Sequence, residues 1–539
     1  MATWPVAKAA DRVAILILLA VTVAAVLTFR DFGLGWDDYT HSQYGDLLVD
    51  LYRSGFADQG ALSFVNLYKY GGGFDMAAAL AAKILPFDLF ETRRLVGAVV
   101  GIIGLIAVWR LARRLGGPTA GAGALALLAA CPIYFGHMFM NPKDIPLAVA
   151  MTVLLLATAR AFEEYPTPNA RTVALFGVGL GAAFGSRVLA GVDAPVIGAG
   201  LLLIAGIEAR RQGWRDAFGR LVQFLWTLLP GFVLAYLIMG LLWPWSVLQP
   251  LNPFRAVEYF DTFFEKPWEE LYEGRLIPVT EMPSGYLFHL FALKLPELML
   301  ALGLCGSALA LIAVAARSQP VTRRGSLLMI SLAVYFPIAL AMITRPALYN
   351  GLRHFVFVIP PFAVLGGLGA GWLIERAQRL GRVAAAASIA LFALGVATPV
   401  VGMARLHPYE YSYFNPLSGG VRAAQDRYML DYWGLAFKQA SAALNAFVDE
   451  KHLQPPNNNG RWVVAICGPE AVARVELGPR FETTFNRKQA DFVMGLGTFY
   501  CRHLTEPVIA EIVREGVVYA RVYDLRGRPT PDILTQPPP

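Results

Sequence analysis

Long apolar runs recur along the first 404 residues, separated by polar connections. A helix needs about 17 to 25 mainly apolar residues to cross a bilayer, and most of these runs approach that length. The pattern predicts eleven membrane-spanning helices, at residues 13–29, 95–109, 118–135, 145–162, 173–185, 188–207, 221–243, 286–314, 327–343, 355–374 and 383–401. A shorter apolar stretch at 74–87 carries Lys83 and predicts a helix at the membrane interface.

The pattern changes at Arg405, after which short apolar runs alternate with Pro, Asn and charged residues. That alternation is typical of a soluble domain. Residues 432–450 have a helical pattern. Three later segments are rich in β-branched and apolar residues and predict strands: 460–468, 490–498 and 516–525. We expect a polytopic α-helical membrane domain over residues 1–404, with loop helices on its outer side, and a small α/β domain over 405–539.

The composition agrees with a membrane location. Hydrophobic residues make up 56% of the 539 positions, charged residues only 16%, and the mean hydropathy is +0.49. A water-soluble protein of this size could not bury so many apolar side chains. The net charge of +7 does not indicate a nucleic-acid partner, because the cations are mostly single arginines at the ends of segments rather than a basic stripe.

Lysine and arginine lie mainly on one side of the predicted spans. With a cytoplasmic N-terminus, the short cytoplasmic segments carry 17 of them, whereas the short connections on the other side carry only Lys143, Arg187, Arg345 and Arg353. Cytoplasmic loops are enriched in these residues, so we expect a multi-pass protein of the inner (plasma) membrane in this orientation. An odd number of spans then places the connections 30–94 and 244–285 and the C-terminal domain on the extracytoplasmic side.

Acidic residues gather where the outer connections meet the membrane. The stretch GWDDYTHSQYGD follows the first span and contains Asp37, Asp38 and His41, while Asp144 precedes the fourth span on the same predicted side. If the first stretch is helical, Asp37 and His41 share one face and Asp38 turns elsewhere. Any loop entering water can carry acids, but the four cations that oppose the charge bias lie on this side too. Such a set suits a substrate with an anionic phosphate and a reaction that needs a general base.

The order of these features resembles that of the GT-C glycosyltransferases, and most closely their protein O-mannosyltransferase-like and lipid A aminoarabinose transferase-like branch. The motifs GWDDYTH, NPKDIPLA and LYNGLRHFVFVIPPF carry the resemblance, and the similar layout covers roughly residues 10–404. It implies an enzyme that takes a sugar from a polyprenyl-phosphate donor at the extracytoplasmic face. The sugar would pass, usually with inversion, to a hydroxyl of a lipid, glycan or protein acceptor, and membrane lipids would surround the enzyme.

The resemblance also implies roles for the acidic residues. Asp37 matches the first acid of the family's loop and would be the catalytic base. Asp38 stands where the family often has glutamate and, like His41, is a candidate for substrate binding. Asp144 matches a second acidic position that holds substrate or orients the base.

The cations would bind the phosphate of the donor. The planar fork of arginine is well shaped for the charge that develops on a departing phosphate, and Arg353 is the preferred residue because the family places phosphate contacts there. Arg345, Lys143 and Arg187 are further candidates. His354 would either bind the phosphate or cap the span.

Metal dependence and the class of function have alternatives. Asp37, Asp38, Asp144 and His41 could supply ligands to Mg²⁺ or Mn²⁺. The branch that the chain resembles generally works without a metal, so we expect no cofactor. A polytopic transporter would need polar or broken helices at mid-membrane, and an envelope-assembly scaffold would need no clustered acids.

Overall fold

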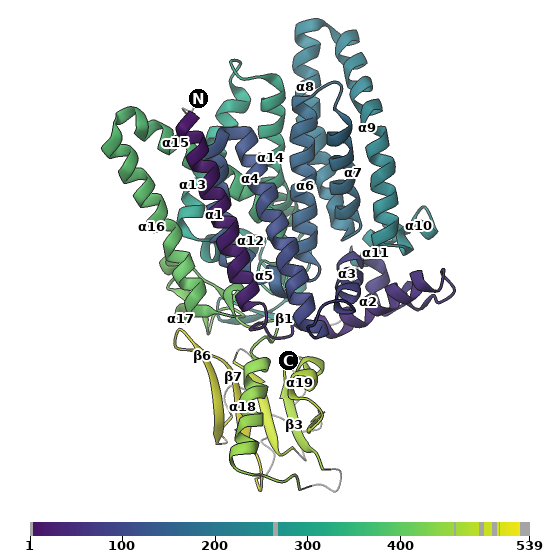
Figure 1. The fold of residues 1–539 in the computed structure, drawn as a ribbon, viewed down its shortest axis with the longest axis vertical. Helices are drawn as coiled ribbons and strands as arrows, with labels where there is room; N and C mark the ends of the chain where they lie inside the picture. The colour runs from purple at the N-terminus through teal and green to yellow at the C-terminus, as the bar shows by residue number, and fades with distance from the viewer. Residues whose placement is uncertain are drawn as a thin grey trace.

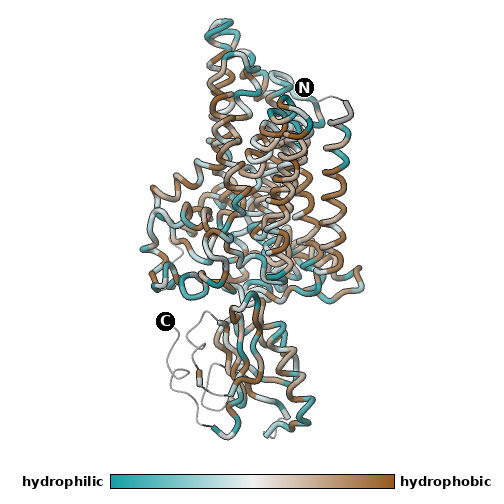
Figure 2. Tube along the Cα trace, turned by 90° about the vertical axis from the view of Figure 1, so that its left-hand side faces the viewer, coloured by the Kyte–Doolittle hydropathy of each residue, from teal (hydrophilic) through white to brown (hydrophobic). Residues whose placement is uncertain are grey.

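The computed structural model describes residues 4–261, 268–456, 460–484, 490–497, 504–505 and 507–528. A bundle of long helices forms most of the molecule, and a small sheet domain packs at one end of it (Figure 1). The N-terminus lies near the opposite end of the bundle. The long helices are hydrophobic along most of their length, whereas hydrophilic residues gather near their ends (Figure 2).

Within the described ranges, nine helices are long and apolar enough to cross a membrane. Short 3₁₀ turns precede two of them, α8 and α15. The nine are α1 (Trp4–Thr28), α4 (Leu89–Ala129), α6 (Asp144–Glu163), α8 (Asp193–Gln212), α9 (Trp214–Leu242), α13 (Glu297–Ala315), α14 (Val321–Thr344), α15 (Ile359–Leu380) and α16 (Arg382–Leu406).

Two features account for the difference between nine helices and eleven predicted spans. Helix α4 contains two predicted spans, which meet at a kink where Gly117 has a φ of 83° and Pro118 follows. Helix α7 (Ala170–Phe184) is shorter, with 15 residues, and packs against α6 and α9. Counting the two halves of α4 separately and adding α7 gives eleven apolar helical segments. The predicted polytopic α-helical fold is therefore confirmed.

Two predicted spans are wrong as continuous helices. The segment 286–314 is divided into α12 (Tyr286–Lys294) and α13, because Leu295 is extended before Pro296. Within the segment 118–135, helix α4 ends at Ala129. A separate helix, α5 (Pro132–Met140), begins after Cys131, whose backbone is also extended. Both breaks come directly before a proline, which disfavours the helical conformation of the preceding residue.

Short elements form the end of the bundle that faces the sheet domain. Helix α2 (Asp38–Arg53) runs crosswise to the spans, next to α3 (Gly73–Ala82), which occupies the predicted interfacial stretch (Figure 1). The second long connection contains α10 (Trp245–Leu248) and α11 (Asn252–Asp261). It also contains an antiparallel hairpin that the sequence did not predict, made of β1 (Glu269–Tyr272) and β2 (Arg275–Pro278).

The C-terminal domain is a five-stranded sheet with strand order β4-β3-β5-β7-β6. Strand β3 pairs in parallel with β4 and β5, whereas β7 pairs antiparallel with β5 and β6. The predicted strands appear as β3, β5 and β7, while β4, β6 and α19 were not predicted. The elements are α18 (Phe437–Glu450), β3 (Trp462–Cys467), α19 (Glu470–Leu477), β4 (Phe481–Thr484), β5 (Phe492–Leu496), β6 (Val508–Arg514) and β7 (Val517–Asp524).

The helix predicted from residue 432 begins later, at Phe437. The carboxylate of Asp431 accepts hydrogen bonds from the backbone N–H groups of Gly434, Leu435 and Ala436 at 2.9–3.0 Å. Gly434 also has a φ of 83°, which few other residues adopt. These bonds fold the DYWG segment into a turn, so the first residues of the predicted helix are not helical.

The packing of α13 on α15 depends on a glycine. A Cβ at Gly306 would lie 1.7 Å from the backbone oxygen of Leu365. We expect Gly306→Val to destabilise the protein by about 1–3 kcal/mol, because the two helices would have to separate. Gly198→Val in α8 is the matched control, since a Cβ there would meet nothing within 4 Å. Thermal unfolding in detergent would measure the difference, and equal midpoints for the two variants would contradict this packing.

Candidate active site

Asp37 lies at the N-cap of α2 and faces two cations from distant parts of the chain. Its Oδ2 is 2.8 Å from Nζ of Lys143 and 3.7 Å from Nη1 of Arg353. The side chain of Asp37 is 25% exposed, whereas those of Lys143 and Arg353 are 12% and 9% exposed. The fold therefore brings together one acid and two cations that the sequence singled out, and leaves the acid partly exposed.

The surroundings of Asp37 decide its protonation state. Burial alone would raise its pKa, but Lys143, Arg353 and His41 outweigh that effect and hold the pKa well below the usual value for aspartate. Asp37 is therefore ionised at neutral pH and able to accept a proton. While both cations hold it, however, it is a weak base.

Asp38 is held by groups that keep it away from the Asp37 cluster. Its carboxylate accepts hydrogen bonds from Nη2 of Arg94 at 2.5 Å and from the N–H of Gly35 at 2.6 Å, and the residue is 1% exposed. The adjacent acids thus have different environments. Asp37 is partly exposed beside Lys143 and Arg353, whereas Asp38 is buried and fixes the turn that carries Asp37.

His41 belongs to the same buried support. Its Nδ1 is 2.6 Å from Oδ2 of Asp75 in α3, and the other oxygen of Asp75 accepts from Nη2 of Arg93 at 2.6 Å. The sequence analysis missed Asp75, Arg93 and Arg94. The signal for Arg93 and Arg94 was available in the sequence, because they are two adjacent arginines directly before a predicted span on the side that is poor in cations.

The NPKD turn directs Lys143 and Asp144 to different partners. The side-chain oxygen of Asn141 accepts from the N–H of Lys143 at 3.2 Å and of Asp144 at 2.9 Å. Asp144 forms an ion pair with Arg187 and accepts from Nδ2 of Asn141 at 2.9 Å, whereas Lys143 turns to Asp37. Two neighbouring ion pairs, Asp37–Lys143 and Asp144–Arg187, therefore line one site.

Arg353 is fixed by contacts on several sides. Its Nη2 donates to the hydroxyl of Tyr349 at 2.9 Å, and its Nε donates to Nε2 of His354 at 3.1 Å. The guanidinium also lies 4.8 Å from the centre of the Trp433 ring. Arg345 is different: it is exposed at the end of α14 and forms no ion pair in the described part of the chain. The structure thus brings Arg353 and His354 into the site but not Arg345.

The hairpin of the second long connection supports the turn before Arg353. The buried carboxylate of Glu270 in β1 lies beside the N–H groups of Asn350 and Gly351, which have φ values of 58° and 65°. Burial raises the pKa of Glu270 to about 7, although these N–H groups and the nearby Arg353 and Lys294 act in the opposite direction. The sequence analysis did not single out Glu270.

The DYWG segment forms another wall of the site. The N–H of Trp36 donates to the backbone oxygen of Trp433 at 2.9 Å, and a Cβ on Gly35 would lie 2.5 Å from the Trp433 ring. The hydroxyl of Tyr432 is 3.1 Å from Nε2 of His137 in α5. The chain that leads into the sheet domain therefore packs directly on the loop that carries Asp37.

A cavity of about 500 Å³ lies beside these charges. Arg187, Tyr349, His354 and Tyr70 form its polar part. The remaining wall is mostly apolar and comes from the 3₁₀ turn before α8, from α11 and from the 346–348 segment, including Val188, Leu189, Val257, Phe260, Pro346 and Leu348. A ligand with a charged head and a hydrocarbon tail matches this division.

The acids of the site are paired with cations rather than with one another. Among the described residues, no group of three or more His, Cys, Asp or Glu could hold one. Asp37, Asp38 and Asp144 each face an ammonium or guanidinium group, and His41 is bound to Asp75. Because cations already occupy the carboxylates, we continue to expect that activity is indifferent to a chelator.

Comparisons with known proteins concern the fold and part of the sequence. Residues 73–243 match the family model described as dolichyl-phosphate-mannose-protein mannosyltransferase. The oligosaccharyltransferase of Archaeoglobus fulgidus superposes with a TM-score of 0.52 at 14% identity, over 88% of this chain and 64% of that one. The fold is that of the GT-C glycosyltransferases. The chain therefore spans less than two thirds of the archaeal enzyme.

Two further GT-C structures are similar to the chain. The A. fulgidus oligosaccharyltransferase AglB, in complex with an inhibitory peptide and a dolichol-phosphate, has a TM-score of 0.50 at 13% identity, covering 92% of this chain and 70% of that one. ArnT from Cupriavidus metallidurans, bound to undecaprenyl phosphate, has a TM-score of 0.49 at 17% identity, covering 97% and 99%. No curated protein matches the sequence of this chain.

Proposed function

We propose that the protein moves a sugar from a polyprenyl-phosphate donor to a hydroxyl of a lipid, glycan or protein acceptor, with Asp37 as the general base. One observation carries the proposal: an ionised, partly exposed carboxylate lies against Lys143 and Arg353, next to a cavity with a polar end and apolar walls. A protein of the same fold was solved with a dolichol-phosphate, which is the same class of lipid.

The donor would enter with its phosphate toward the cations. Arg187 and His354 line the polar part of the cavity, and Lys143 and Arg353 lie next to them at Asp37. Arginine binds phosphate through two parallel hydrogen bonds. The apolar wall would hold the first part of the prenyl chain, which is hydrocarbon and favours such a surface.

The reaction would be a single displacement at the anomeric carbon. The acceptor oxygen forms a bond to that carbon, and the bond from the carbon to the phosphate oxygen breaks with its electron pair staying on the phosphate. The acceptor proton passes to Asp37, and the anomeric configuration inverts. Polyprenyl phosphate is already a good leaving group, so the site needs one base and cations that stabilise the phosphate.

Donor binding would also activate the base. A phosphate that shares Lys143 and Arg353 weakens their hold on Asp37, and the pKa of Asp37 rises as that attraction falls. A carboxylate with a higher pKa is the better proton acceptor. The ion pair of the empty site would therefore keep Asp37 inactive until the donor arrives.

The pH dependence of the reaction tests this coupling. Lys143 lowers the pKa of Asp37, so Lys143→Gln should raise that pKa and move the acid limb of the kcat/KM profile to higher pH. Lys83→Gln, at the end of α3 and outside the cluster, is the control and should keep the wild-type profile. If the acid limb of Lys143→Gln stayed at the same pH or moved to lower pH, Asp37 would not be the titrating base.

The substrates can be identified in cells. Mass spectrometry of envelope lipids, glycans and proteins would be compared between cells with and without the gene, and after complementation with wild type or Asp37→Asn. We expect one sugar to be missing without the gene, to return with wild type and to stay missing with the variant. Identical sugar profiles in all four strains would contradict the proposed function and favour a transporter or scaffold.

A further inference from the structure

A groove of about 710 Å³ runs along the last turns of α16, at the end of the bundle that carries the sheet domain. Helix α16 forms one wall. The other wall consists of residues 413–422, which lead into α17 (Gly420–Ala424), and of Glu515 between β6 and β7. Apolar and aromatic side chains cover much of the surface: Leu394, Val401, Leu406, Tyr413, Phe414 and Val421.

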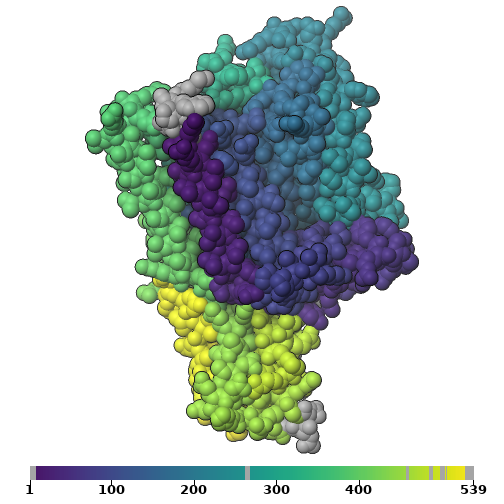
Figure 3. Space-filling view, in the orientation of Figure 1, coloured from purple at the N-terminus to yellow at the C-terminus, as the bar shows by residue number. Residues whose placement is uncertain are grey.

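The apolar part of this groove faces the surroundings of the bundle. Only 6% of the apolar window of α16 is buried, and Leu394 and Val401 are 66% and 48% exposed. Helix α16 lies at the side of the molecule, and its end is directly above the strands of the sheet domain (Figure 3). A membrane-spanning helix exposed in this way is surrounded by lipid, so the groove suits a hydrocarbon chain.

Two arginines stand at the polar end of the groove. Nε of Arg405 is 3.8 Å from Oε1 of Glu515, and Nε of Arg422 donates to the backbone oxygen of Glu515 at 2.6 Å. This end of the groove thus holds two guanidinium groups and one carboxylate, which leaves an excess of positive charge. Tyr413 also lines the groove, and its hydroxyl is buried with no hydrogen-bond partner among the described residues.

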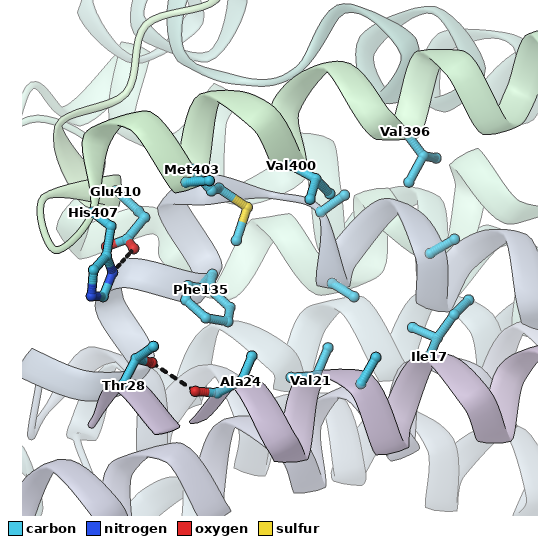
Figure 4. Close-up of a pocket in the computed structure, with 15 residues that line it drawn as sticks. Ile17, Val21, Ala24, Thr28, Phe135, Val396, Val400, Met403, His407 and Glu410 are labelled. Carbon is cyan, nitrogen blue, oxygen red and sulfur yellow. Dashed lines mark hydrogen bonds and ion pairs between the residues drawn. The ribbon is translucent and has the colours of Figure 1, made fainter. Parts of the chain in front are cut away.

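The other side of α16 has a groove with the opposite charge. That groove, of about 570 Å³, lies between α1 and α16 and is lined by residues such as Val21 and Met403 (Figure 4). At its polar end, His407 lies 2.7 Å from Glu410 and 3.0 Å from Asp31. Two carboxylates flank this histidine, so an anionic headgroup would be repelled there. Of these two grooves, the one with the two arginines combines apolar walls with excess positive charge.

We propose that the groove formed by α16, residues 413–422 and Glu515 binds one anionic phospholipid, such as phosphatidylglycerol. Its phosphate would lie between Arg405 and Arg422 and one acyl chain would follow α16 toward Leu394. Guanidinium groups bind phosphate with charge-assisted hydrogen bonds, and basic pockets between spans bind anionic headgroups. The bound lipid would join α16 to the β6–β7 turn and so fix the sheet domain against the bundle.

Native mass spectrometry of the purified full chain tests this site. The protein would be exchanged into micelles with equal amounts of phosphatidylglycerol and phosphatidylethanolamine. We expect wild type to retain one phosphatidylglycerol, and the double variant Arg405→Gln/Arg422→Gln to bind it about tenfold more weakly, because charge-assisted bonds are lost. Arg53→Gln, an exposed arginine of α2 outside the groove, should bind like wild type.

Three further measurements complete the test: two more variants and a competition with inorganic phosphate. Ala397→Phe fills the apolar part of the groove without changing the arginines, and we expect it to reduce retention too. Arg405→Lys/Arg422→Lys keeps the charge and should retain more lipid than the glutamine variant, which separates binding from a folding defect. Equal retention of the two lipids by wild type, full retention by Ala397→Phe, or displacement by an equal concentration of inorganic phosphate would each overturn the proposal.

Discussion

Replacing Asp37 with asparagine should lower the rate of sugar transfer by about 10²–10⁴-fold, the usual contribution of a positioned general base. Asparagine keeps the size of the side chain but cannot take the acceptor proton. The measurement is the initial rate of transfer by purified protein under saturating donor. Because Lys143 and Arg353 would remain to bind phosphate, we expect the loss mainly in kcat rather than in KM.

The control for this experiment is Asp46→Asn. Asp46 is an exposed acid on the same helix, two turns beyond Asp38. The Asp46→Asn protein should transfer sugar at the wild-type rate. A well-folded Asp37→Asn protein with the same rate as this control would reject the assignment of Asp37.

Replacing Arg353 with glutamine should lower transfer by about 10²–10³-fold, the cost of removing one positioned donor from developing charge. Arg353→Lys should fall between glutamine and wild type, because lysine keeps the charge but loses the planar fork. Arg353 is held in place by Tyr349, His354 and Trp433, so neither substitute can reproduce its geometry. Initial rates and donor affinity, measured separately, would show whether phosphate binding or its departure is affected.

Arg345→Gln is the matched control for Arg353. Both arginines belong to the same connection between α14 and α15, but Arg345 is exposed and makes no ion pair within the described residues. We expect its substitution to leave transfer close to wild type. A large loss in Arg345→Gln, with none in Arg353→Gln, would mean that the phosphate binds elsewhere.

Much of the layout followed from the sequence because hydrophobicity and charge are local signals. Apolar length predicted the spans, and the acidic stretch after the first span led to Asp37. Lys143 and Arg353 could be named because they stand out on a side that otherwise has few cations. Their approach to Asp37, at 2.8 and 3.7 Å, depends on the packing of helices far apart in the chain.

The missed features depend on long-range contacts. Glu270 looks like any acid in a polar loop, and only the fold shows its carboxylate in the turn at Asn350 and Gly351. Trp433 was missed for the same reason. The sequence pattern around it predicted an ordinary helix in the soluble domain, yet its ring lies against Arg353. The sequence also could not predict that Asp37 and Asp38 have different environments, because it is the start of α4 that brings Arg94 to Asp38.

The most direct test of the central claim follows the donor. Purified protein in lipid nanodiscs would be incubated with labelled polyprenyl-phosphate sugars and a membrane extract as the source of acceptor. The account predicts that wild type releases polyprenyl phosphate in equal amount to the sugar transferred, with or without a chelator, and that Asp37→Asn does not. Transfer only from a nucleotide sugar, or equal release by wild type and Asp37→Asn, would contradict it.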